Sequence, residues 1–162
     1  MNAPRPQSSI HLQAHMKTIV ALVDFSNDTF KVLKQVHQMA GAFGSRVILL
    51  HVVPPQPVVM DLGIASPTVL ETPSPETVQA ERAKLQELQD SLSKFGISVT
   101  AQQLTDGTPD AVMDEIKRLE ADLVIMGSHK HGALYNLFVG SVTNDVLKRM
   151  TCPVLLVPVD DA

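Results

Sequence analysis

Two glycine-serine pairs, Gly127-Ser128 and Gly140-Ser141, bracket one stretch of the chain. Glycine lets the backbone approach a ligand closely, and backbone N–H groups at a helix N-terminus bind anions. The hydroxyl of Ser141 adds a further donor that suits a phosphate group. The pattern therefore indicates an anion site, although glycines that serve only in tight turns would give the same spacing.

Asp24 is the second group that could do chemistry. It follows an apolar run at 18–23 and precedes a helical pattern, so its carboxylate can accept hydrogen bonds where a strand ends. One interpretation is a ligand contact. The other is a helix cap, because the helix dipole favours an aspartate at a helix start.

Other polar groups have weaker support as site residues. The nucleotide-binding fingerprints GxGxxG and GxxxxGK[ST] are both absent from the sequence. His129 and His131 have no cysteine or carboxylate at a metal-ligand spacing, so we expect them to line the glycine-rich loop or to pair with phosphate. We expect His51 to be a hydrogen-bonded, half-buried histidine rather than a catalyst, and Cys152 to be a small buried thiol without a redox role.

The elements that must position these groups begin with short, unbroken apolar runs, which are typical of strands buried on both faces of a parallel sheet. The predicted strands span 18–23, 46–53, 122–126 and 154–159, with a more alternating candidate at 97–104. Helical patterns lie between them, which predicts an α/β domain with a mainly parallel sheet and right-handed crossovers. Such sheets bind ligands at the carboxyl ends of their strands, where the strand order reverses.

Start and stop signals predict four helices, the first at 27–43. The start signals are Ser26, Ser74-Pro75, Thr108-Pro109 and Ser141, and the stop signals are Gly44 and Gly96. The side chains expected to face the core are Phe30, Leu33, Val36, Ala40 and Phe43 in the first helix, Val112, Ile116 and Leu119 in the third, and Val142, Val146 and Leu147 in the fourth.

The segment 54–75 interrupts this alternation. It is punctuated by prolines and is too long for an ordinary connection in a compact domain. It either covers a site or forms a surface loop whose few apolar side chains pack locally.

The composition fits one globular domain and disfavours several classes of function. The chain has 162 residues, of which 44% are hydrophobic and 19% charged, with a net charge of -4 and one cysteine. The acidic balance disfavours nucleic-acid binding, and no apolar run is long enough to cross a bilayer. A lone cysteine does not indicate an oxidising compartment, so we expect a cytoplasmic protein. We expect a flexible polar tail at 1–15 and one domain at 16–160, with Met16 as an alternative start.

From residue 17 to residue 159 the sequence resembles the universal stress proteins of the UspA-like superfamily. The stretches that carry the resemblance are KTIVALVDFS, VILLHVV and DLVIMGSHKHGALYNLFVGSVTNDVLKRMTCPVLLVPV. The resemblance implies a single Rossmann-like domain whose five-stranded parallel sheet has the order 3-2-1-4-5, with helices on both faces. The reversal would then lie between the first and fourth strands, with Asp24 and Gly127 on its two sides.

The resemblance also implies a nucleotide site. The pattern G-x2-G-x9-G-[ST] of ATP-binding members falls on Gly127, position 130, Gly140 and Ser141, and position 130 is a lysine. The Lys130 side chain either blocks close approach of a phosphate or pairs its ammonium group with one. The complete set of expected nucleotide-binding residues is Leu22, Val23, Asp24, Val52, Met126, Gly127, Ser128, Lys130, His131, Gly132, Gly140, Ser141 and Val142.

By the same resemblance, Asp24 would contact the adenosine, and Val52 and Met126 would lie along the adenine. The residues around Gly127 and Gly140 would surround the ribose and phosphates. No general base or dedicated magnesium carboxylate is evident near the glycine-rich stretch, so hydrolysis of ATP would be slow at most.

Two functional hypotheses follow. The first is a stress-response switch or regulator that binds ATP, with or without magnesium; AMP, a cyclic nucleotide or another adenine nucleotide is the alternative ligand. The second is a nucleotide-free homodimeric interaction module in which Lys130 marks the loss of ATP binding. The C-terminal run VLLVPV would form an edge strand that needs protection, and the resemblance implies a homodimer through it. We expect a protein partner of unknown identity, but no nucleic acid and no membrane.

Overall fold

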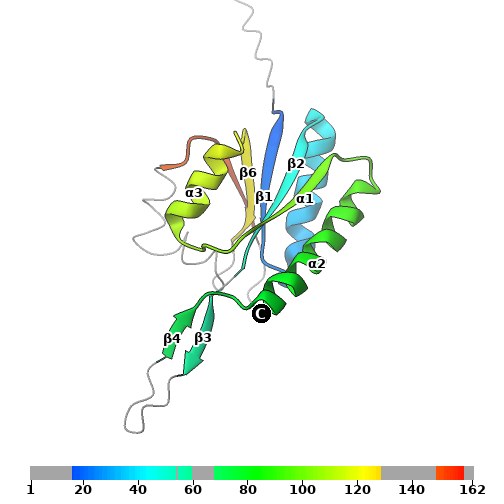
Figure 1. The fold of residues 1–162 in the computed structure, drawn as a ribbon. Helices are drawn as coiled ribbons and strands as arrows, with labels where there is room; N and C mark the ends of the chain where they lie inside the picture. Colours follow the sequence, from blue (N-terminus) through cyan, green and yellow to red (C-terminus); the bar gives the residue numbers. More distant parts are fainter. Residues whose placement is uncertain (1–15, 54, 60–67, 129–148, 159–162) are drawn as a thin grey trace, which may run out of the picture.

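The computed structural model describes residues 16–53, 55–59, 68–128 and 149–158. A five-stranded parallel sheet forms its centre, in the order β5-β2-β1-β6-β7 (Figure 1). Its strands are β1 (Thr18–Val23), β2 (Arg46–Val52), β5 (Val99–Leu104), β6 (Leu123–Gly127) and β7 (Val154–Val157). This is the predicted 3-2-1-4-5 order, so the predicted fold class is confirmed.

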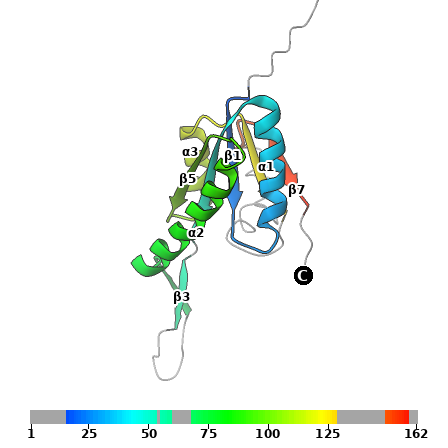
Figure 2. The same cartoon turned by 90° about the vertical axis from the view of Figure 1, so that its right-hand side faces the viewer.

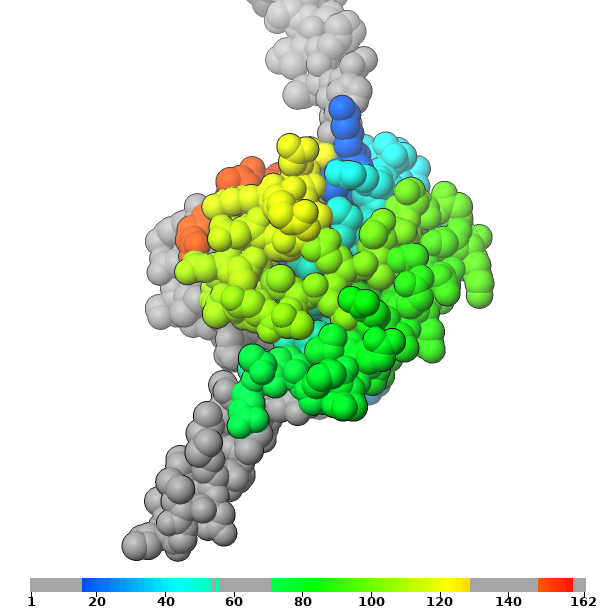
Figure 3. All heavy atoms as spheres, viewed as in Figure 1, coloured from blue at the N-terminus to red at the C-terminus, as the bar shows by residue number. Residues whose placement is uncertain are grey.

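Within the described residues, three helices cover the two faces of the sheet. Helices α1 (Thr29–Phe43) and α2 (Pro75–Ser93) lie on one face, and α3 (Pro109–Arg118) lies on the other (Figures 1 and 2). In the space-filling view, atoms of α3, β5 and α2 form one continuous surface along the β5 edge (Figure 3). No helix of the described segments is long and apolar enough to cross a membrane.

The core follows the alternation of side chains along the strands. Every residue of β1 is buried. Ile19 and Ala21 pack with the cluster under α1 and α2, whereas Val20 and Leu22 pack with the cluster under α3. Burial on both faces explains why the strands read as continuous apolar runs in the sequence.

Helices α2 and α3 begin at the predicted signals. The Ser74 hydroxyl accepts a hydrogen bond from the Thr77 N–H at 3.2 Å, and the Thr108 hydroxyl accepts one from the Ala111 N–H at 3.3 Å. Each cap is followed by a first-turn proline. Gly44 ends α1 in the left-handed conformation, as its position in the sequence predicted.

The predicted start of α1 was wrong, and its predicted buried face was right only in part. Asp28, not Ser26, is the N-cap residue, and it makes no side-chain capping bond. Ser26 lies in the preceding turn, where its N–H donates to Asp24 Oδ1. Phe30 and Phe43 are exposed, and the buried stripe is Thr29, Val32, Val36 and Ala40. The prediction was therefore right for Val36 and Ala40, and Leu33 is partly buried against the same core.

The segment 54–75 contains a hairpin that was not predicted. Strands β3 (Gln56–Val59) and β4 (Thr68–Glu71) pair antiparallel and project from the body of the domain (Figures 1 and 2). The hairpin was not predicted because the segment contains prolines, and a proline inside an apolar run argues against a strand except at the edge of a sheet. Pro57 occupies such a position, paired with Leu70 in a two-stranded ribbon.

Several boundaries differ from the prediction by one or two residues. The strand β5 begins at Val99, and β6 begins at Leu123. The side chain of Asp122, the residue before β6, binds the start of β1. Its Oδ2 atom accepts hydrogen bonds from the backbone N–H groups of Lys17 and Thr18 at 2.8 and 2.9 Å. The predicted fourth helix near Ser141 lies outside the described residues.

Candidate functional site

The sheet opens between β1 and β6 at the carboxyl ends of its strands. The pairing of β1 with β6 ends at Leu22 and Met126, whereas β1 stays paired with β2 one residue further, at Val23 and His51. On the other side, the Ser128 N–H donates to the carbonyl oxygen of Val157 at 3.0 Å. The β1–β6 ladder therefore ends one residue before the β1–β2 ladder. This point, called the opening of the sheet below, lies at the reversal of strand order, where such sheets bind ligands.

Three of the expected site residues pack together beneath this opening. Leu22, Val52 and Met126 are buried members of the cluster on the α3 face of the sheet. Val23 points to the opposite face and belongs to the cluster under α1 and α2. Its contribution at this end of the sheet is therefore its carbonyl group rather than its side chain.

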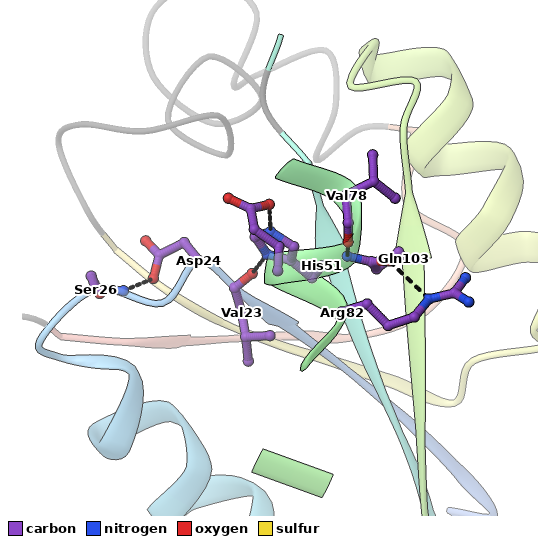
Figure 4. Close-up of polar contacts among 8 residues, drawn as sticks. Val23, Asp24, Ser26, His51, Val78, Arg82 and Gln103 are labelled. Carbon is purple, nitrogen blue, oxygen red and sulfur yellow. Dashed lines mark hydrogen bonds and ion pairs between the residues drawn. The ribbon is translucent and has the colours of Figure 1, made fainter. Parts of the chain in front are cut away.

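Asp24 directly follows β1, and Gly127-Ser128 lie at the end of β6. Asp24 Oδ1 accepts a hydrogen bond from the Ser26 N–H at 3.1 Å (Figure 4). It accepts a second one from the Thr29 hydroxyl at 3.3 Å. The carboxylate therefore shapes the β1–α1 loop, but it does not occupy the N-cap position of α1. Gly127 is half-buried and Ser128 is exposed at the end of β6.

The residue after Asp24 has an unusual backbone. Phe25 has a φ of 59°, in the left-handed region that a bulky residue rarely adopts. Its ring lies on His51, with 4.1 Å between the ring centroids, and the Lys84 ammonium lies 5.8 Å from the Phe25 centroid. Side-chain contacts thus hold a turn that the backbone alone would disfavour.

His51 is hydrogen-bonded, as expected, but it is fully buried rather than half-buried. Its Nδ1 atom lies 2.7 Å from the carbonyl oxygen of Val23 (Figure 4). Its Nε2 atom lies 2.7 Å from Oε2 of Glu81 on α2. The histidine therefore connects the last residue of β1 with α2.

Gln103 makes a second connection between the carboxyl ends of the strands and α2. It is the register neighbour of His51 on β5. Its Nε2 atom donates to the carbonyl oxygen of Val78 at 3.1 Å, and its Oε1 atom accepts from Arg82 Nε at 3.3 Å (Figure 4). The N-terminal half of α2 is thus attached to the carboxyl end of the sheet at two points.

The β5–α3 loop approaches the same edge from the α3 side. A Cβ atom at Gly107 would lie 3.1 Å from Cγ1 of Val52, so the absence of a side chain leaves space for Val52. Next to it, the Asp106 carboxylate accepts a hydrogen bond from the Thr108 N–H at 2.9 Å, which lowers the pKa of Asp106.

Sequence reasoning missed Phe25, Glu81, Gln103 and Gly107. Gly107 had a usable signal, since it directly precedes a helix start at the end of a strand. Glu81 had no such signal in the sequence, because it is one of several charged residues on α2 and lies 30 residues from His51. The remaining expected residues, Lys130, His131, Gly132, Gly140, Ser141 and Val142, lie outside the described residues.

Two hollows lined by described residues lie away from the sheet opening. One of about 400 Å³ lies between α2 and β5, and an apolar groove of about 280 Å³ runs between α1 and α2. Within the described segments, no group of three or more His, Cys, Asp or Glu side chains is arranged to hold a metal ion.

Comparison with known proteins gives the family. The model of the universal stress protein family matches residues 15–158. A universal stress protein of Thermus aquaticus is 28% identical over 142 residues, which cover 87% of this chain and 98% of that protein.

Solved structures share the fold. The universal stress protein of Archaeoglobus fulgidus in complex with dAMP superposes with a TM-score of 0.59 at 21% identity, covering 88% of this chain and 97% of that one. An Arabidopsis thaliana family protein with AMP bound gives a TM-score of 0.56 at 16% identity, covering 89% and 92%. With a family model that spans nearly its whole length, the chain belongs to the universal stress protein family.

Proposed function

We propose that this protein binds an adenine nucleotide, with ATP as the expected ligand, and acts as a stress-response switch or regulator. The observation that carries the proposal is the opening of the β1–β6 ladder at the strand reversal, with Asp24 on one side and Gly127-Ser128 on the other. The relatives with dAMP or AMP bound support adenine nucleotides as the ligand class.

Under this proposal each part of the opening has a different task. The buried side chains of Leu22, Val52 and Met126 form an apolar base beside the adenine. Asp24 accepts a hydrogen bond from the nucleoside, because an ionised carboxylate is an acceptor only.

The glycine-rich stretch completes the proposed site. Gly127 and Ser128 would lie beside the ribose. The residues that follow would bind the phosphates; these are Lys130, His131, Gly132, Gly140, Ser141 and Val142. Backbone N–H groups and the Ser141 hydroxyl would supply neutral donors, and Lys130 would supply a positive charge. Magnesium, if bound, would accompany the phosphates.

The second candidate is a homodimeric interaction module that binds no nucleotide. Lys130 in place of a glycine and an exposed Leu156 on the last strand of the sheet favour it. The Lys130→Gly variant separates the two candidates. The module interpretation predicts that ATP binding occurs only in this variant.

Calorimetric titration with ATP, AMP and dAMP tests the nucleotide proposal, using Asp24→Asn as the site variant. We expect the wild type to saturate at micromolar ligand and Asp24→Asn to bind about tenfold or more weakly, the scale of one hydrogen bond to a charged group. Asp90→Asn is the matched control, because Asp90 lies on α2 and hydrogen-bonds Gln86. Equal affinities for wild type and Asp24→Asn would contradict the assigned role of Asp24.

A further inference from the structure

His51 is a buried polar residue that the proposed nucleotide contacts do not use. It has a relative exposure of 3% and lies between Val23 on β1 and Gln103 on β5 in the sheet register. A polar ring in such a position is costly unless both of its nitrogens find partners. Both nitrogens of His51 have a partner: Nδ1 lies beside the carbonyl oxygen of Val23 on β1, and Nε2 lies beside the carboxylate of Glu81 on α2.

The partners define how the ring is held. The carbonyl oxygen of Val23 can only accept a hydrogen bond, so His51 Nδ1 is the donor. The Nε2 atom faces the Glu81 carboxylate at 2.7 Å, and this contact fixes the orientation of the ring. Glu81 comes from α2, so the orientation of the ring depends on where this helix packs.

The same ring also contacts the other neighbour of Asp24. The Phe25 ring lies 4.1 Å from the His51 ring, centroid to centroid, at an interplanar angle of 41°. Phe25 has the positive φ of 59°, a strained conformation that persists only where its surroundings hold it. His51 therefore contacts both residues that flank Asp24. It binds the carbonyl group of Val23 and packs on the side chain of Phe25.

We propose that His51 is a positioning residue for the nucleotide site: it holds Val23 and Phe25 so that the Asp24 carboxylate is fixed at the opening of the sheet. Glu81 supports it by fixing the imidazole ring. This inference rests on the proposed function of Asp24, but the positioning of the loop can be measured without any ligand.

Two substitutions separate the two hydrogen bonds of His51. The amide nitrogen of Asn occupies approximately the place of Nδ1, so His51→Asn keeps a donor for the Val23 carbonyl. The amide nitrogen of Gln reaches approximately the place of Nε2, so His51→Gln loses that donor and keeps a group near Glu81. His37→Asn is the matched control, since His37 is exposed on α1.

The first readout is amide hydrogen exchange of Ser26 in the unliganded protein, followed by NMR. This N–H donates to Asp24 Oδ1 at 3.1 Å, so its exchange reports whether the carboxylate is held. The second readout is the affinity for AMP or ATP. We expect His51→Gln to exchange Ser26 about tenfold faster and to bind about tenfold more weakly, with His51→Asn closer to wild type in both. A role in stability alone would instead make both variants lose affinity in proportion to their loss of thermal stability.

Glu81→Ala serves as a second variant, which keeps the His51 ring but takes away the partner of its buried Nε2 atom. Only the ring support is removed, and we expect faster Ser26 exchange than in the wild type. Wild-type exchange and affinity in both His51→Gln and Glu81→Ala would overturn the inference. If the wild type binds no adenine nucleotide, the proposed function fails, and the Ser26 exchange pattern alone then supports or overturns the positioning of the loop.

Discussion

At the scale of single residues, Cys152 shows how burial and charge set reactivity. It is the chain's one cysteine and is packed against the core on the α3 face. Burial raises the pKa of its thiol, and the negative charge of Asp122 raises it further. Because the thiolate is the reactive form, the raised pKa makes this cysteine less reactive than it is in the unfolded chain.

Alkylation by iodoacetamide tests this assignment. Since the folded pKa is raised, we expect the rate for Cys152 to increase with pH around a higher midpoint in the folded protein than in the urea-unfolded chain. At pH 7 to 8 the folded protein should react more slowly. Mass spectrometry gives the rate without ambiguity, as no other thiol is present. Equal midpoints for the folded and unfolded chains would show that the pKa shift is absent.

At the scale of elements, the strands of the parallel sheet and two helix starts could be predicted because their causes are local. β1 and β2 read as apolar runs since each is buried on both faces. Ser74-Pro75 and Thr108-Pro109 start helices because the cap and the proline act within one turn.

The start of α1 could not be predicted in this way. The positive φ of Phe25 moves Ser26 out of the capping position, and tertiary contacts with His51 and Lys84 hold that turn. The candidate site likewise contains residues that could be predicted from the local sequence and contacts that could not. Asp24 and Gly127 follow strand ends and could be identified locally, whereas the His51–Glu81 contact joins residues 30 positions apart.

The two capped helices give a prediction about stability. Ser74→Ala and Thr108→Ala each remove the hydroxyl that accepts a backbone hydrogen bond, so each should lower the free energy of unfolding by about 1 kcal/mol. Urea denaturation measures the loss. Ser93→Ala is the control, an exposed serine at the last residue of α2, and should change stability by less than about 0.5 kcal/mol. Cap variants as stable as this control would contradict the capping assignment.

At the scale of the whole molecule, the two edges of the sheet differ. On β5, the backbone N–H of Ala101 donates to the Gln89 side chain of α2 at 2.6 Å, so α2 partly covers that edge. At the other edge, β7 carries Leu156, which is 46% exposed. We therefore propose that the protein forms a homodimer through β7, because pairing across a two-fold axis would protect this edge.

Sedimentation at micromolar concentration tests the dimer. We expect the wild type to sediment as a dimer and Leu156→Glu to sediment as a monomer, because the substitution places a charge in the proposed interface. Phe95→Glu is the matched control: Phe95 is 69% exposed but lies just beyond α2. A monomeric wild type would contradict the proposal, as would dissociation caused equally by the control variant.

The most direct test of the central claim is to identify the small molecules released when the purified protein is denatured, and then to titrate the ligand-free protein with ATP. Mass spectrometry of the released material requires no assumption about which nucleotide binds. We predict recovery of an adenine nucleotide, or saturation by ATP at micromolar concentration in the protein with its natural Lys130. Neither recovery nor saturation in the wild type, together with ATP binding by Lys130→Gly, would contradict nucleotide binding and favour the interaction module.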